Sequence, residues 1–304
     1  MSSHHITRAL SATLLLLSTI TAAAVLSGDK SERQNDEPSG YMCITFDQLP
    51  VTSAFTEVDR QAVTDRILNA LKEHEVTAAG FVVGENIQGG FDLLGNWLNE
   101  GHILGNQTES HVDLHDVGPE TFIGQVKAGA EALEPMLEGF GQKKRYFRFP
   151  FLHYGTTVAA KREVQSYLTR QDYIIGHATI VVDDYLYDLS LENLGEKPDS
   201  LALNHIGNDY VDHVIEQVEH AEHLAVKVLK RPCNQILALR ANRLNSFVLD
   251  ALLAELAERG YAFVSLDMAL KDNVFEAPEA YFGPESLGYV ERILRSDPDL
   301  MPAQ

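Results

Sequence analysis

Five ionisable residues stand at, or just past, the ends of segments that read as buried strands. Asp47 comes first, in "ITFDQLP" (44–50), where an apolar run gives way to a loop. His111, Arg148, Asp184 and Arg240 hold the same kind of position later in the chain. Carboxylates and imidazoles can move protons or bind a metal, and a guanidinium can orient a carboxylate. Such residues at the carboxyl ends of parallel strands predict a catalytic or binding site.

The hydrophobic pattern predicts the framework that would bring these strand ends together. Apolar runs alternate with amphipathic stretches such as 59–75, in which Val63, Ile67, Leu68 and Leu71 share one helical face. The expected strands lie within 41–47, 78–84, 102–111, 146–151, 172–184, 235–242 and 261–266. Strands that alternate with helices indicate parallel pairing in a barrel or a doubly wound sheet. We expect one α/β domain over 41–290 and a C-terminal tail at 291–304.

Residues 1–40 read as export and linker sequence. Arg8 precedes the apolar run "ALSATLLLLSTITAAAVL", and Ala22 and Ala24 supply an A-x-A cleavage site. We expect a signal peptide at 1–24, a flexible linker at 25–40, and an exported protein, periplasmic or extracellular, without stable membrane association after cleavage. The run also approaches the length of a membrane span, so an uncleaved anchor is the alternative.

Composition narrows the classes of partner. The chain has 304 residues, with 44 Asp and Glu against 24 Lys and Arg, and a formal net charge of −20. Such a surface repels phosphate backbones, so we expect no nucleic-acid partner. Of the two cysteines, Cys43 lies in an expected strand and Cys233 lies two residues before the expected strand 235–242. Buried free thiols are favoured there, although an exported protein would permit a disulfide.

The segments that carry these residues resemble the polysaccharide deacetylase family (the NodB-homology domain, carbohydrate esterase family four), in the bacterial branch whose first motif reads TFDDLP. The resemblance runs from about Tyr41 to Tyr289. It rests on "ITFDQLP", "GNQTESH", "RYFRFPFLHYG", "TIVVDDYLYD", "QILALRANRLN" and "LDALLAELAERGYAFVSLDMAL". It implies a distorted (β/α) barrel, a divalent, zinc-type metal and removal of acetyl groups from N-acetylated sugars. The implied partner is an N-acetylated glycan or cell-wall polysaccharide.

Four positions keep the residues that the family uses. The resemblance makes Asp47 the general base and Arg148 the residue that positions it. It makes Asp184 the acid that tunes the catalytic histidine, and His111 one of the metal ligands. These assignments predict a catalytic core of Asp47, Arg148 and Asp184.

Three positions depart from the family. Gln48 stands where the family has a metal-binding Asp, Gln107 where it has the first metal-binding His, and Arg240 where it has the general-acid His. Zinc prefers nitrogen, sulfur or carboxylate ligands over amides, and a guanidinium gives up no proton. A missing acid alone costs on the order of 10²–10⁴ in rate. We expect no bound metal, weak or absent hydrolysis, and Arg240 near Asp47 as the balancing charge.

The remaining candidates are aromatic or imidazole residues near the motifs. Tyr154 and Tyr185 are expected to bind substrate by stacking on sugar rings. His153 reads as a hydrogen-bonded loop residue and Trp97 as part of the core. The histidines of the expected helix 205–230 read as an exposed polar stripe.

Three functions are consistent with the sequence. The first is an exported family member that still faces glycans but hydrolyses the amide C–N bond weakly or not at all. The second is an active amidohydrolase with a rearranged metal site made by Asp47, His111 and His115, which lies four residues after His111 in "HVDLH". The third is a non-catalytic glycan-binding or structural protein of the cell envelope.

Overall fold

The computed structural model describes residues 37–52, 57–195 and 199–296. The expected signal peptide and most of the expected linker lie outside these ranges. The fold is that of the compact unit that begins at Pro38. Within the described ranges, no helix is both long enough and apolar enough to cross a membrane.

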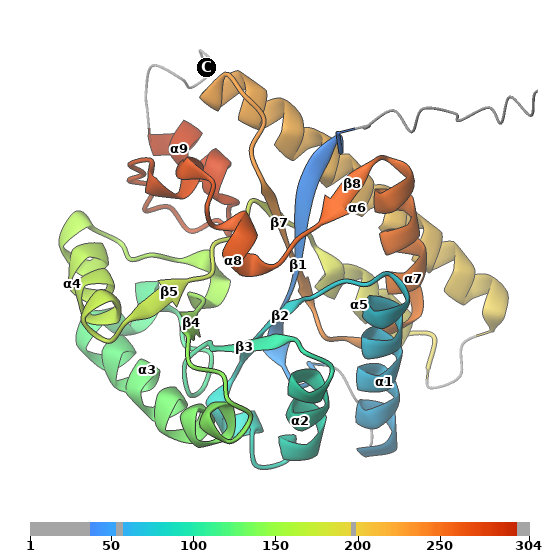
Figure 1. Cartoon of the computed structure of the whole chain (residues 1–304), viewed down its shortest axis with the longest axis horizontal. Helices are drawn as coiled ribbons and strands as arrows, with labels where there is room; N and C mark the ends of the chain where they lie inside the picture. Colours follow the sequence, from blue (N-terminus) through green and yellow to red (C-terminus); the bar gives the residue numbers. More distant parts are fainter. Residues whose placement is uncertain (1–36, 53–56, 196–198, 297–304) are drawn as a thin grey trace, which may run out of the picture. The chain divides into compact units, whose positions relative to one another are not determined.

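The centre of the fold is a sheet whose pairings are all parallel (Figure 1). Its order is β5-β4-β3-β2-β1-β7-β6, and β8 pairs with the start of β1. The strands are β1 (Gly40–Leu49), β2 (Ala79–Val82), β3 (Ile103–Asn106), β4 (Arg145–Phe147), β5 (Tyr173–Ile175), β6 (Ile180–Val181), β7 (Gln235–Arg240) and β8 (Tyr261–Phe263). β5 and β6 lie at opposite ends of this order, so the described strands form a curled, incompletely closed sheet. The expected distorted (β/α) barrel is confirmed.

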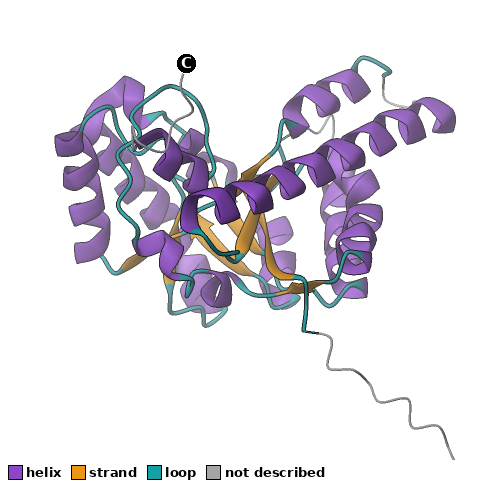
Figure 2. Cartoon of the chain, turned by 90° about the horizontal axis from the view of Figure 1, so that it is seen from above, coloured by secondary structure: helices purple, strands orange, loops and turns teal. Residues whose placement is uncertain are grey.

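Helices connect the parallel strands and surround the sheet in both views (Figure 2). They are α1 (Glu57–Glu73), α2 (Phe91–Asn99), α3 (Leu114–Gly139), α4 (Val158–Arg170), α5 (Asp184–Glu192), α6 (Ser200–Leu229), α7 (Arg243–Glu258), α8 (Leu266–Ala269) and α9 (Tyr289–Ser296). The described ranges also contain three short 3₁₀ helices, η1 (Gly84–Asn86), η2 (Pro150–Leu152) and η3 (Asn273–Glu276). Each strand therefore delivers its carboxyl end to the same edge, where the loops that follow can build one site.

The core forms because β1 is apolar along most of its length and is covered by amphipathic helices. Met42, Ile44 and Phe46 are fully buried. Trp97 of α2 is also fully buried, as expected, and its ring meets that of Phe46 edge-on, with 5.2 Å between the centroids. Cys43 and Cys233 are buried free thiols, as favoured by the sequence.

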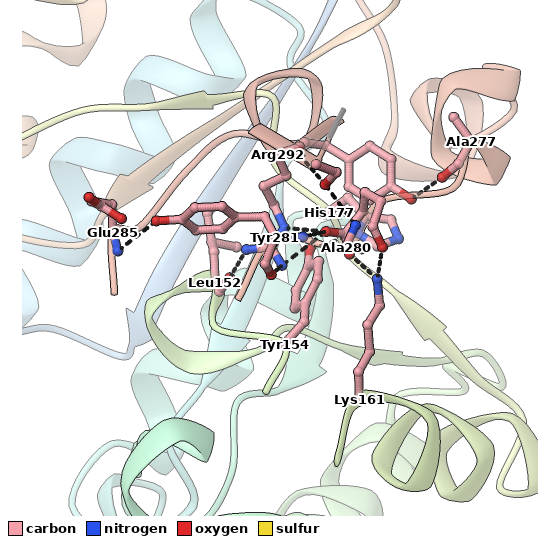
Figure 3. Close-up of polar contacts among 12 residues, drawn as sticks. Leu152, Tyr154, Lys161, His177, Ala277, Ala280, Tyr281, Glu285 and Arg292 are labelled. Atoms are coloured by element: carbon pink, nitrogen blue, oxygen red, sulfur yellow. Dashed lines mark hydrogen bonds and ion pairs between the residues drawn. The ribbon is translucent and has the colours of Figure 1, made fainter. Parts of the chain in front are cut away.

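The carboxyl-terminal helix α9 is anchored by a buried charge network (Figure 3). The guanidinium of Arg292, 1% exposed, donates to a Glu279 carboxylate oxygen at 3.2 Å and to the carbonyls of Leu152 and Tyr281 at 3.0 and 2.9 Å. Lys161 of α4 forms a second ion pair with Glu279. The boundary expected at residue 290 falls inside this helix, and the packed fold extends at least to Ser296.

Replacing Arg292 with Ala should lower the free energy of unfolding by about 3–5 kcal/mol, because it takes one of two cationic partners from the buried Glu279 carboxylate and leaves two carbonyls without this donor. Urea denaturation measures this change. Arg295→Ala is the matched control on the same helix, because Arg295 makes only a solvated ion pair with Glu291. That control should change stability by no more than about 0.5 kcal/mol. Equal effects of the two variants would contradict the anchoring role of Arg292.

Candidate functional site

The five strand-end residues meet at the carboxyl edge of the sheet, as the sequence predicted. β1 pairs with β7 in a register that sets Asp47 beside Arg240. A small cavity of about 40 Å³ opens there, lined by Asp47, Gln48, His111, Phe151 and Arg240 together with Leu152, Val181, Val182, Ala238 and Leu239. This volume holds only a few water molecules. A sugar ring therefore has to lie over the mouth of the cavity, with at most a small substituent inside it.

Asp47 is held by a buried guanidinium. Nη1 of Arg148 donates to Oδ1 of Asp47 at 2.8 Å and to the hydroxyl of Thr45 at 2.7 Å. Nε donates to the Gly176 carbonyl at 2.8 Å and Nη2 to the His177 carbonyl at 3.1 Å. Arg148 is fully buried, so these bonds fix the carboxylate in one orientation. This is the positioning arrangement that the resemblance implied.

Gln48, Gln107 and His111, which stand at the family's three metal-ligand positions, also lie close together. The backbone N–H of Gln48 donates to Oε1 of Gln107 at 2.7 Å. The side-chain amide of Gln48 lies 3.1 Å from Nε2 of His111. The same amide nitrogen lies 3.4 Å from Nδ1 of His111, so it faces the ring between the two nitrogens. An amide nitrogen only donates, so a nitrogen of the imidazole accepts. The amide of Gln48 thus lies against the His111 ring nitrogens that a metal would approach.

Arg240 and Asp184 form the second charge pair of the site. The guanidinium of Arg240 bonds to Oδ1 of Asp184, and its backbone N–H donates to Oδ2 at 2.7 Å. Asn245 adds a donor to Oδ2 at 3.0 Å. Burial raises the pKa of Asp184, and the charge and hydrogen bonds of Arg240 oppose that shift. Arg240 acts on Asp47 only as a nearby charge, so the direct partner of Asp47 is Arg148 rather than Arg240.

The family's zinc does not fit the residues at this position. Of the three positions where the family has metal ligands, 48, 107 and 111, only His111 carries a side chain of a type that binds zinc. The amides of Gln48 and Gln107 hydrogen-bond within the site. The pKa of His111 is lowered to about 4, chiefly by burial; the positive charge of Arg240 adds to this shift, and the Asp47 and Asp113 carboxylates oppose it. A guanidinium that lowers an imidazole pKa also repels a divalent ion in the same place.

Two further residues lie differently from what the sequence suggested, whereas a third lies as expected. Tyr154 is 2% exposed and its hydroxyl hydrogen-bonds Nδ1 of His177 at 2.8 Å, so it is a core residue and cannot stack on a sugar (Figure 3). His115 lies in α3 rather than on a loop, and it stacks on His153 instead of joining Asp47 and His111. Tyr185 is 51% exposed, with the Arg240 guanidinium 5.4 Å from its ring centroid, and stays available to a ligand.

Sequence reasoning missed several residues that complete the site. Thr45 stands two residues before Asp47 on β1, so its side chain faces the same side of the sheet; this spacing was a usable signal. Asn245 binds both Asp184 and the Arg240 carbonyl from the first turn of α7. Phe151 lines the cavity, and its ring lies 4.8 Å from that of His111. Nothing local in the sequence marks Phe151 or Asn245.

Comparison with known proteins names the family. The family model described as polysaccharide deacetylase matches residues 34–168, which run from β1 into α4 and include Asp47, His111 and Arg148. This segment of the chain is a polysaccharide deacetylase domain. The resemblance of the sequence motifs is thus confirmed, while the residues after 168, including Asp184 and Arg240, lie beyond the matched segment.

Curated members of the polysaccharide deacetylase family are similar to this chain. The peptidoglycan-N-acetylglucosamine deacetylase of Bacillus cereus is 27% identical over 172 residues, which are 57% of this chain and 56% of that protein. This chain therefore spans just over half the length of that enzyme. The peptidoglycan-N-acetylmuramic acid deacetylase PdaA of Bacillus subtilis is 23% identical over 216 residues, 71% of this chain and 69% of that protein.

Solved structures of the polysaccharide deacetylase family share the fold. PdaA of Bacillus subtilis superposes with a TM-score of 0.53 and 21% identity, covering 76% of this chain and 80% of PdaA. A carbohydrate esterase family 4 pseudoenzyme from Bacillus anthracis superposes with a TM-score of 0.51 and 16% identity, covering 77% of this chain and 66% of that one. At these identities the likeness establishes the fold alone.

The lowered pKa of His111 should make stability depend on pH. Between its ordinary value of 6.5 and its value of about 4 in the fold, the unfolded chain binds a proton that the folded chain does not. The free energy of unfolding should therefore fall as the pH falls through this window, with roughly 2–3 kcal/mol coming from His111. Urea denaturation at pH 7.5 and pH 4.5 should show a smaller difference for His111→Leu than for the unchanged chain.

Two variants control for the cause of that shift. Arg240→Gln removes a repelling charge and should raise the pKa of His111, whereas Asp47→Asn removes an attracting charge and should lower it. NMR titration of the His111 ring measures both. Shifts of the same sign in the two variants would mean that the electrostatic description of this site is wrong.

Proposed function

We propose that this chain is an exported, glycan-binding member of the polysaccharide deacetylase family in which hydrolysis of the acetamido C–N bond is lost. The curated relatives named above are deacetylases of peptidoglycan sugars. The ligand proposed here is accordingly an N-acetylated glycan of the cell wall. Export rests on the leader-like segment at 1–24 and on the location of such a polymer.

The observation that carries this proposal is the closed charge balance of the site. Asp47 is paired with Arg148, and Asp184 is paired with Arg240. Hydrolysis of an amide needs a polarised carbonyl, an activated water and an acid for the leaving amine. Arg240 stands where the family has the acid and cannot donate a proton. Gln48 and Gln107 stand where the family has metal ligands, and their amides hydrogen-bond within the site instead.

The same pocket keeps features that suit sugar binding. Asp47 is half-buried at the cavity wall with its second oxygen free of the Arg148 bond, so it can accept from a sugar hydroxyl or an acetamido N–H. Two exposed aromatic rings stand by the site: Phe151, 44% exposed, lines the cavity, and Tyr185, 51% exposed, lies against the Arg240 guanidinium. Exposed aromatic surface beside a few convergent polar groups is the usual composition of a small-molecule site.

Loss of hydrolysis is tested by restoring the family's residues. The unchanged chain should release no acetate from N-acetylglucosamine oligomers with zinc, cobalt or nickel added. The combined variant Gln48→Asp, Gln107→His and Arg240→His should gain metal-dependent acetate release, because it returns two metal ligands and an acid. Asp suits position 48, whose φ of 59° lies in the left-handed region that Asp tolerates better than most residues.

Two results decide this test. Turnover by the unchanged chain that disappears in Asp47→Asn and His111→Leu would overturn the proposal and favour a rearranged active site. Arg240→His alone is the control, because it restores the acid without the metal ligands and should stay inactive.

Glycan binding is tested on the two exposed rings. Phe151→Ala and Tyr185→Ala should each weaken binding of N-acetylglucosamine oligomers about 5- to 10-fold, because each removes about 1 kcal/mol of ring contact. Isothermal titration calorimetry measures the change. Phe140→Ala is the matched control, since Phe140 is 43% exposed but caps the carboxyl end of α3, which leads to the opposite edge of the sheet. No measurable binding by the unchanged chain would leave a structural envelope protein as the better reading.

A further inference from the structure

Asp113, His115 and His153 form a cluster outside the position of the family's metal. Among the described residues they are the group of three acidic or imidazole side chains whose ligand atoms all lie within 4.8 Å of one another. Asp113 is the N-cap of α3, and His115 is the second residue of that helix. His153 follows η2 directly. The cluster therefore joins the loop that carries His111 to η2, which carries Phe151.

The two ring nitrogens of His153 both face acceptors. Nδ1 lies 2.8 Å from Oδ2 of Asp113, and Nε2 lies 3.0 Å from the carbonyl of Pro284. A carbonyl only accepts, so Nε2 carries a proton and the ring cannot turn without losing this bond. With Nε2 protonated, Nδ1 and the carboxylate present two electron pairs to each other. A positive charge has to stand between them, and either a second proton or a metal ion supplies it.

His115 offers a third electron pair. Its ring stacks on that of His153, with centroids 4.1 Å apart and planes 10° apart. Its Nε2 is shielded from solvent and has no hydrogen-bond partner in the described part of the chain. A shielded nitrogen without a partner is uncommon in folded proteins and calls for a water or an ion.

We propose that Asp113, His115 and His153 bind a zinc-type divalent cation. Two imidazoles and one carboxylate form the donor set of three-ligand zinc sites, in which water takes the fourth position. Donor atoms around a tetrahedral zinc are about 3.4 Å apart, between the 2.8 Å contact of Asp113 with His153 and the 4.8 Å limit of the cluster. Nδ1 of His153 is the ligand atom, and its bond to the Pro284 carbonyl is the orienting contact that metal-binding histidines usually make.

Binding requires one adjustment. Stacked rings hold their electron pairs in parallel planes, so the His115 ring has to tilt until Nε2 points at the ion. His115 is only partly buried. The opposing charge is Arg292, which acts on His115 from α9 but is already paired with Glu279. The Asp113 carboxylate outweighs it because it is a direct ligand.

The ion would brace the mouth of the pocket. The Phe151 ring lies between the two sites, 4.8 Å from the His111 ring and 5.9 Å from the His153 ring. Linking Asp113 to His153 fixes the loops on either side of this ring. The proposal shares no ligand with the family position and does not depend on whether the pocket hydrolyses its glycan.

The test is zinc binding by the whole chain after treatment with a chelator, at pH 7.5. The unchanged chain should take up one equivalent by equilibrium dialysis and should unfold at a higher temperature with zinc than without it. His115→Phe keeps a ring for stacking but removes the donor, and Asp113→Asn keeps a good N-cap but removes the charge. Each should weaken zinc binding at least about tenfold. Cobalt substituted for zinc should give the absorption of a tetrahedral nitrogen and oxygen site.

His111→Phe separates the two positions, because His111 belongs to the family site and not to this cluster. It should leave the bound equivalent in place. The proposal is overturned if the unchanged chain binds no zinc, or if the equivalent is lost in His111→Phe and kept in His115→Phe. It is also overturned if both cluster variants bind zinc as tightly as the unchanged chain, since the ion would then lie elsewhere.

Discussion

The buried guanidinium of Arg148 is the constraint on which the site depends. A fully buried cation is costly unless its donors are matched, and removing one partner of such a pair is more costly still. Here the partners come from β1, through Thr45 and Asp47, and from the segment after β5, through Gly176 and His177. Its carbon also lies 4.1 Å from the centroid of the Phe81 ring of β2. Moving any of these strands would leave the buried guanidinium without a partner, so the edge of the sheet keeps its shape.

A site held in this way can keep its shape when the cation that faces its carboxylates is replaced by another. The family's residues place a divalent metal against carboxylates, whereas this chain places Arg240 against Asp184 beside the Asp47–Arg148 pair. In both arrangements the carboxylates keep a cationic partner, and the sheet register that sets Asp47 beside Arg240 does not depend on which cation is used. The pseudoenzyme from Bacillus anthracis shares this fold. Retention of the fold is therefore no measure of retained hydrolysis.

The sequence predicted the fold, the family and the strand-end position of each charged residue, because these follow from hydrophobic periodicity and from motifs with fixed spacing. It failed where partners lie far apart in the chain. The distance of Arg240 from Asp184 and from Asp47 depends on the pairing of β6 and β1 with β7, so the sequence could supply the charges but not choose between the two acids. The sequence placed Tyr154 at the rim of the pocket, because an aromatic residue of the core and one of the rim look the same in a sequence. Only packing shows that it lies under Arg292, whose guanidinium carbon is 4.1 Å from its ring centroid.

The backbone around the site carries strain that the network has to hold. Of the eight described non-glycine residues with positive φ, five lie around the site, with φ between 52° and 69°: Gln48, Thr108, His111, Phe151 and Leu152. Such conformations cost of order 1–3 kcal/mol each and persist where surrounding contacts over-determine them. The chain supplies such contacts. The N–H groups of Gln48 and Thr108 donate to the side chains of Gln107 and Asn106, at 2.7 Å each. Arg292 donates to the Leu152 carbonyl. The strained geometry is thus maintained by hydrogen bonds and buried charges of the chain itself. A metal at the family position is not needed to keep the pocket's shape, which explains how its ligands could be replaced while the residues around them stayed in place.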